Sequence, residues 1–67
     1  MYEIDKEKLK ELRVSKKLDQ DAVGELIGRN RKHVSHYENG VAVPPGNVLL
    51  NYLIVFNVKP IYIAKKV

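Results

Sequence analysis

Nine consecutive residues near the middle of the chain carry most of the side chains that could do chemistry. Within residues 31–39 the polar side chains able to meet a ligand are Arg31, Lys32, His33, Ser35, His36 and Asn39. Arginine and lysine donate hydrogen bonds to guanine O6 and N7 in the DNA major groove, which is wide enough to admit a helix. Val34 and Tyr37 lie at helical spacing and can bury the opposite face. The pattern favours a helix that reads base edges.

Other interpretations of the same stretch are weaker. The charged residues could form an ordinary solvated helix face. His33 and His36 are three residues apart and could share a metal, but no third ligand is evident. Ser35 and His36 are adjacent, so they cannot face each other as a catalytic pair. With no phosphate-cradling glycine loop either, the sequence argues against an enzyme and predicts no metal or cofactor.

Capping residues divide the chain into short helices. Asp5, Asp19 and Asn30 can each cap a helix start, and Gly28 and Gly40 suit the left-handed position that ends one. We expect helices at residues 5–17, 20–27, 31–39, 47–56 and 60–66, with the VAVPPG segment at 41–46 as a loop. The β-prone segment Ile61–Ile63 leaves a C-terminal strand as an alternative. The expected fold is a compact all-α domain of five helices.

Length and composition restrict the class of protein. Sixty-seven residues form one domain, 1–67, and the absence of cysteine excludes disulfides. The longest apolar run, residues 48–58, is far shorter than the roughly 20 residues a membrane span needs. The N-terminus lacks the apolar stretch of a signal peptide, so we expect a cytoplasmic protein without a membrane partner. The net charge of +4 is only a modest indication of nucleic acid binding.

Taken in order, these segments resemble the Xre/Cro-type helix-turn-helix family of phage repressors and bacterial regulators. The matching segments are LKELR (9–13), LDQDAVGELIG (18–28), VSHYENG (34–40) and FNVKPIYI (56–63). The glutamine that opens the second helix and the Tyr-Glu-Asn-Gly that closes the third are the most specific parts. The resemblance covers about residues 5–66 and implies a lambda-repressor-like fold that binds duplex DNA.

The resemblance also implies roles for individual residues. It places Gln20 against a DNA phosphate and makes Arg13 and Glu38 a largely buried ion pair. The residues that it places at base edges are Arg31, Lys32 and His36. Those that it places near the backbone-contacting rim are Asn30, His33, Ser35 and Asn39.

Three positions depart from the family pattern. Arg29 stands where the family usually has an apolar residue, and it could reach phosphate instead. Gly24 replaces the usual alanine, at a cost of about 1 kcal/mol in helix propensity, and a plausible gain is close approach of the second helix to the third. The loop at 41–46 carries no cation.

The expected fourth helix is apolar on nearly all sides. Its stretch VLLNYLIVF (48–56) has only Asn51 as a clearly polar residue, and so small a domain cannot bury every face of one helix. The alternatives are a slightly apolar surface or a subunit interface. In the family the dimer interface commonly uses the C-terminal end, so we expect it to include Ile54, Ile61, Tyr62 and Ile63.

These observations predict a sequence-specific regulator of transcription. It would bind a double-stranded DNA operator as a homodimer, with residues 31–39 in the major groove, and repress by occupancy. No small-molecule ligand is expected. The alternative is a protein-binding module, such as an antitoxin or antirepressor with the same fold. The uncharged loop 41–46 favours that alternative, and the cationic face of residues 31–39 opposes it.

Overall fold

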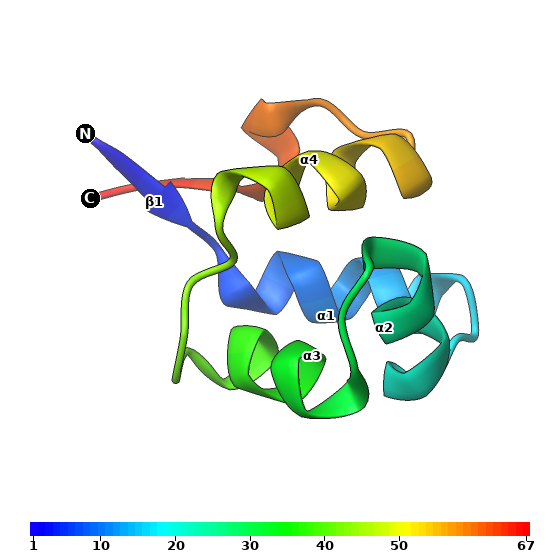
Figure 1. The fold of residues 1–67 in the computed structure, drawn as a ribbon. Coiled ribbons are helices and arrows are strands. Elements are labelled where there is room, and N and C mark those ends of the chain that lie inside the picture. Colours follow the sequence, from blue (N-terminus) through cyan, green and yellow to red (C-terminus); the bar gives the residue numbers. More distant parts are fainter.

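Four α-helices make up most of the computed structural model, which describes residues 1–67. In chain order the elements are β1 (Tyr2–Ile4), α1 (Lys6–Ser15), α2 (Gln20–Ile27), α3 (Arg31–Asn39), α4 (Gly46–Val55), the 3-10 helix η1 (Pro60–Ile63) and β2 (Ala64–Lys66). In Figure 1, α1 lies between α3 on one side and α4 on the other. The main helix contacts join α2 to α3, α1 to α3, and α2 to α4.

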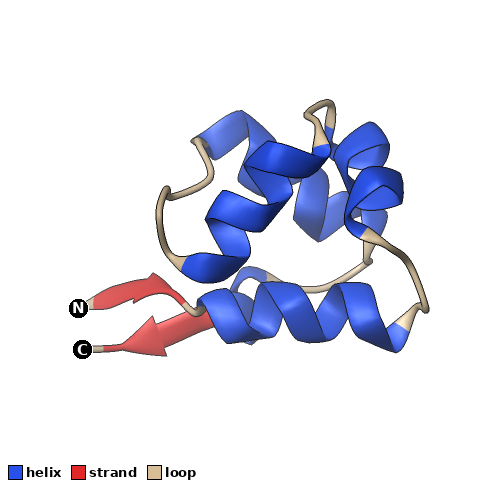
Figure 2. Ribbon diagram, turned by 90° about the horizontal axis from the view of Figure 1, so that it is seen from below, coloured by secondary structure: helices blue, strands red, loops and turns tan.

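The expectation of an all-α domain with five helices is wrong at the C-terminus. The expected fifth helix stops after one 3-10 turn, because the carbonyl of Ile63 accepts a hydrogen bond from the Asp5 backbone N–H at 2.8 Å instead of continuing a helix. The chain then forms β2, which pairs antiparallel with β1 and brings the two ends of the chain together, as Figure 2 shows. The alternative of a C-terminal strand is therefore correct, although the strand begins at Ala64, after the segment Ile61–Ile63 that suggested it.

One apolar core holds the helices together. It contains Leu9, Leu12, Val23, Ile27, Val34, Tyr37, Val48, Tyr52, Phe56 and Ile63. A polar residue of α4 also has a structural role, because the Asn51 side-chain amide donates to the Ile27 carbonyl at 3.0 Å. This bond ties α4 to the end of α2, immediately before the turn that leads into α3.

All four α-helices end in the same backbone motif, with a residue in the left-handed region. Gly28 and Gly40 occupy it with φ of 75°, but Lys17 and Asn57 occupy it with φ of 57° and 53°. The left-handed residue at Lys17 ends α1 two residues before the expected limit, and the next N–H, of Leu18, donates back to Arg13 at 3.2 Å. A side chain in this conformation costs roughly 1 kcal/mol relative to glycine.

The structure explains why position 24 is glycine and not the alanine that is usual in the family. A Cβ at this position would lie 2.9 Å from the carbonyl carbon of Asn30 and 3.0 Å from the carbonyl oxygen of Arg29. Both are backbone atoms of the turn between α2 and α3, which cannot move aside as a side chain can. The same turn is held by the Arg29 N–H, which donates to the Gly24 carbonyl at 2.7 Å. Glycine therefore lets this turn pack directly against α2.

We expect Gly24→Ala to destabilise the protein although alanine is the better helix former. Overpacking against the turn should cost about 1–3 kcal/mol, against a gain of about 1 kcal/mol in helix propensity. Urea unfolding would measure the difference. Gly46→Ala is the matched control, because a Cβ there meets nothing within 4 Å. A Gly24→Ala protein more stable than the parent would contradict this account of the turn.

Candidate nucleic-acid interface

Helix α3 directs four polar side chains away from the core. Asn30 caps it, and Val34 and Tyr37 fix it to the core with 0% and 4% of their surface exposed. At about 100° per residue, Arg31, Lys32, Ser35 and His36 fall within one arc of roughly 140°, away from those buried residues. Arg31 and Lys32 are exposed and form no ion pair or side-chain hydrogen bond, whereas Ser35 and His36 are half-buried. The first turn of α3 therefore offers unpaired cationic donors to solvent.

The N-cap of α3 also determines the tautomer of His33. The Asn30 side-chain oxygen accepts from the His33 backbone N–H at 3.1 Å and lies 3.0 Å from His33 Nδ1. Because an amide oxygen can only accept, Nδ1 must carry the proton in this contact. A neutral His33 then has a bare Nε2, which can accept a hydrogen bond but cannot donate one. His33 can donate to a further partner only as the charged imidazolium.

Three other residues expected at the interface lie at its edges. Arg29 is half-buried and its guanidinium donates to the Gly28 carbonyl at 3.0 Å, beside the end of α2. Asn39 is exposed at the end of α3, where its amide donates to the Ser35 hydroxyl at 3.2 Å. Gln20 begins α2 and is half-buried, and its amide donates to Glu38 Oε1 at 3.3 Å.

Arg13 and Glu38 form a bidentate ion pair beneath this surface. Arg13 Nε lies 2.7 Å from Glu38 Oε2, and Arg13 Nη2 donates to Glu38 Oε1 at 3.0 Å. Their side chains are only 15% and 3% exposed. A third Arg13 donor, Nη1, reaches the Leu18 carbonyl at 3.1 Å. The hydrogen bond to Glu38 raises the pKa of Arg13, so the guanidinium stays charged and connects α1, the α1–α2 turn and the end of α3.

The sequence does not reveal that Tyr52 belongs to the same region. Its side chain is fully buried, and its hydroxyl has no hydrogen-bond partner. Burial raises the pKa of this phenol, and the nearby Glu38 carboxylate raises it further, so the group remains neutral. Helical spacing from Val48 predicts only that Tyr52 faces the core, because its closeness to the ion pair depends on tertiary packing.

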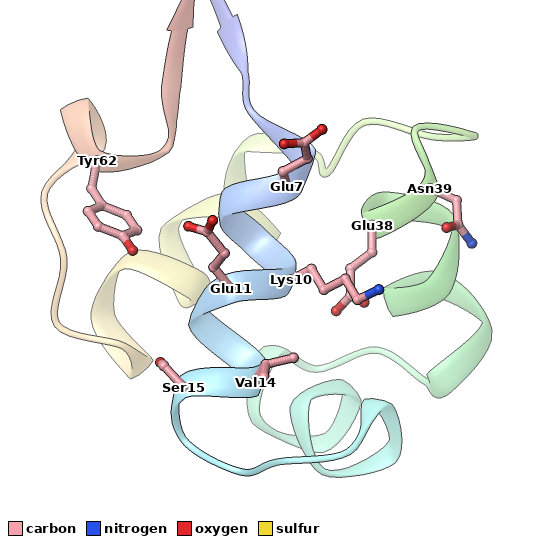
Figure 3. A pocket seen from close by; sticks show the side chains of 8 residues that line it. All are labelled: Glu7, Lys10, Glu11, Val14, Ser15, Glu38, Asn39 and Tyr62. Carbon is pink, nitrogen blue, oxygen red and sulfur yellow. The ribbon is translucent and has the colours of Figure 1, made fainter.

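A shallow hollow on the outer side of α1 offers less chemistry. Its lining residues are Glu7, Lys10, Glu11, Val14, Ser15, Glu38, Asn39 and Tyr62. Figure 3 shows these side chains spread over both sides of α1, with Tyr62 on one side and Asn39 on the other, rather than converging on a point. No group of three potential metal ligands occurs anywhere in the molecule, and no helix has the length and apolar character needed to cross a membrane.

Of the residues expected at a dimer interface, the structure leaves three exposed and buries one. Ile54 and Ile61 are each 67% exposed and Tyr62 is 41% exposed, and Leu50 on α4 is 54% exposed. Ile63 is only 3% exposed, so its expected place at the interface is wrong. The η1 turn directs its side chain into the core, next to α1 and α4, where it already has partners.

Comparison with known proteins agrees with this arrangement. A family model described as Helix-turn-helix matches residues 9–63. No curated protein matches the sequence. Among solved structures, the fold is similar to that of the P22 c2 repressor protein in complex with the synthetic operator 9T in the presence of Tl⁺, with a TM-score of 0.83 and 24% sequence identity. The match covers 91% of this chain and 92% of that chain. The protein thus belongs to the Xre/Cro-type helix-turn-helix family.

Proposed function

We propose that this protein is a sequence-specific double-stranded DNA-binding regulator of transcription, with α3 in the major groove. The observation that carries the proposal is the unpaired, exposed state of Arg31 and Lys32 on a helix whose opposite face is buried. Arginine and lysine at the start of a helix can donate to guanine O6 and N7 when that helix enters the groove. His36 lies on the same face, one turn further along α3.

The neighbouring polar residues support a second type of contact. The amide of Gln20 would donate to a phosphate at the start of α2, and the half-buried Arg29 lies at the turn before α3. Asn30, His33, Ser35 and Asn39 flank the base-reading residues. Contacts to phosphate position a protein on DNA, whereas contacts to base edges select the sequence.

This division of roles makes a prediction for alanine variants. Arg31→Ala or Lys32→Ala should cost about 1–3 kcal/mol on a preferred site and relax the choice at one or two base pairs. Gln20→Ala should weaken binding to all sequences more evenly. Fluorescence anisotropy on specific and random duplexes would measure both effects. Equal losses on the two kinds of DNA for all three variants would contradict the assignment.

A selection of bound duplexes from a random pool is the broadest test of the proposed function. Enrichment of one sequence would support base reading, and enrichment of an inverted repeat would support a two-fold dimer. In that dimer the exposed residues Leu50, Ile54, Ile61 and Tyr62 would contact the same residues of the second subunit. Binding to the operator would repress transcription by occupying the site. A pool that remains random after selection would favour the alternative function below.

The alternative function, a protein-binding module such as an antitoxin or antirepressor, has one observation in its favour. Val41 and Val43 are 70% and 72% exposed in the loop between α3 and α4, which has no cation. Such a loop suits an apolar partner better than a phosphate backbone. The cationic face of α3 remains unexplained by this alternative.

The protonation of His33 predicts that DNA binding depends on pH. Because a neutral His33 has no outward donor, a contact from it to phosphate requires the imidazolium, which a lower pH favours. At fixed salt we therefore expect tighter DNA binding as the pH falls. The double variant His33→Gln/His36→Gln should lose the dependence, and the single variants would show each histidine's share. A double variant with the parent's pH profile would exclude this linkage.

A further inference from the structure

The hydrogen bond between Gln20 and Glu38 joins the ion pair in the interior to the surface that would meet DNA. Glu38 Oε1 accepts from both Arg13 Nη2, at 3.0 Å, and Gln20 Nε2, at 3.3 Å. The carboxylate is 3% exposed, and Arg13 neutralises its charge. Glu38 can therefore hold a surface amide without presenting an uncompensated negative charge to a polyanion.

This contact determines which end of the Gln20 amide faces Glu38. The carboxylate is an acceptor only, so a flipped amide would bring its carbonyl oxygen against another acceptor. With Nε2 held toward Glu38, one N–H is used inside and the second remains for an outside partner. The carbonyl oxygen, which would repel a phosphate, cannot exchange places with the amino group while the hydrogen bond lasts.

The residues around Gln20 make the orientation of its amide important for contact with a phosphate. Asp19 and Asp21, on either side of Gln20 in the chain, are acidic and exposed, and the first turn of α2 carries no cationic side chain of its own. Asp19 is the N-cap and its carboxylate accepts from the Ala22 N–H at 2.8 Å. A phosphate at this position would depend on neutral donors, namely the first backbone N–H groups of α2 and the Gln20 amide.

We propose that Glu38 is a positioning residue for DNA binding, which holds the Gln20 amide with an N–H directed to the phosphate. The inference rests on the proposed function, and it adds a second role to a residue whose first role is the ion pair. Pre-orientation acts by reducing the side-chain freedom that is lost when the contact forms. The effect should therefore appear as affinity for DNA of any sequence.

The experiment first examines the free protein, without DNA. Nitrogen-15 relaxation of the Gln20 side-chain amide should show an ordered group in the parent and a mobile group in Arg13→Met/Glu38→Leu, in which the acceptor is gone. This variant replaces the whole pair by apolar residues, a change that proteins often tolerate, whereas Glu38→Gln would keep an amide oxygen that can still accept from Gln20. The Asn51 side-chain amide, which is bonded to Ile27, is the internal control and should stay ordered throughout.

A double-mutant cycle on random-sequence duplex then tests the link to DNA. Gln20→Ala should weaken binding about 3- to 10-fold in the parent, the effect of one lost hydrogen bond, and less than 2-fold where Glu38 is already replaced. A Gln20 amide that is equally mobile in parent and variant would overturn the proposal, whatever the DNA result. An amide that becomes mobile while Gln20→Ala weakens binding equally in both backgrounds would also overturn it. If no variant or parent binds DNA, the proposed function fails and the inference fails with it.

Discussion

Arg13→Met is expected to unfold most of the protein at room temperature. The substitution leaves the Glu38 carboxylate, with 3% of its side chain exposed, without its two strongest hydrogen bonds. Removing one partner of a buried ion pair typically costs about 3–5 kcal/mol. A domain of this size has a stability of roughly 3–10 kcal/mol in total. Circular dichroism during a thermal melt would measure the loss.

Two controls separate the stranded charge from other effects of this substitution. Arg13→Met/Glu38→Leu removes both charges and should recover much of the lost stability, because apolar replacements of whole buried pairs are often neutral or stabilising. Lys8→Met removes a cation from the same helix, where the pair with Glu11 is exposed and spans 3.3 Å, and should change stability little. An unchanged melting temperature for Arg13→Met would show that the pair does not stabilise the fold.

Ile61→Glu is expected to remove most of the affinity for a full palindromic operator. Ile61 is 67% exposed, so a charge there should be tolerated by the monomer, but it would be buried against its copy in the proposed two-fold dimer. Linking two binding units commonly raises affinity by about 10²- to 10⁴-fold, and this gain is what the variant should lose. Sedimentation would measure association, and gel shifts on full and half operators would measure the coupling.

The structure provides two comparison variants for the dimer test. Val43→Glu places the same charge on an equally exposed residue of the loop before α4 and should leave dimer formation unchanged. Ile63→Glu, in contrast, buries a charge in the core and should unfold the monomer itself. A parent protein that stays monomeric at high concentration and on its operator would contradict the proposed dimer.

The sequence predicts α2 and α3 well because their limits depend on local interactions. Asp19 and Asn30 accept hydrogen bonds from backbone N–H groups three residues ahead, and Gly28 and Gly40 take the left-handed position that ends each helix. Such signals lie within one turn of the chain. The end of α1 was less predictable because Lys17 takes the left-handed conformation without being glycine or asparagine.

Features that depend on distant parts of the chain could not be predicted. The strand β1 is three residues long, mostly exposed, and exists because β2 pairs with it from the other end of the chain. The segment Ile61–Ile63 is uniformly apolar, so its pattern does not show that only Ile63 turns inward. The contact between Gln20 and Glu38 depends in the same way on how α2 packs against the end of α3. The DNA contacts of α3 stay predictions.

The pairing of β1 with β2 means that the backbone nearly forms a ring. The Val67 N–H donates to the Met1 carbonyl at 3.0 Å, so the first and last residues are already neighbours. A few added residues could join them without disturbing any helix, and a covalent ring of this length would lose about 4 kcal/mol of chain entropy in its unfolded state. New ends could then be opened in the exposed loop between α3 and α4. The fold therefore depends on the order in which the helices follow one another around this ring, and much less on the point at which the chain starts.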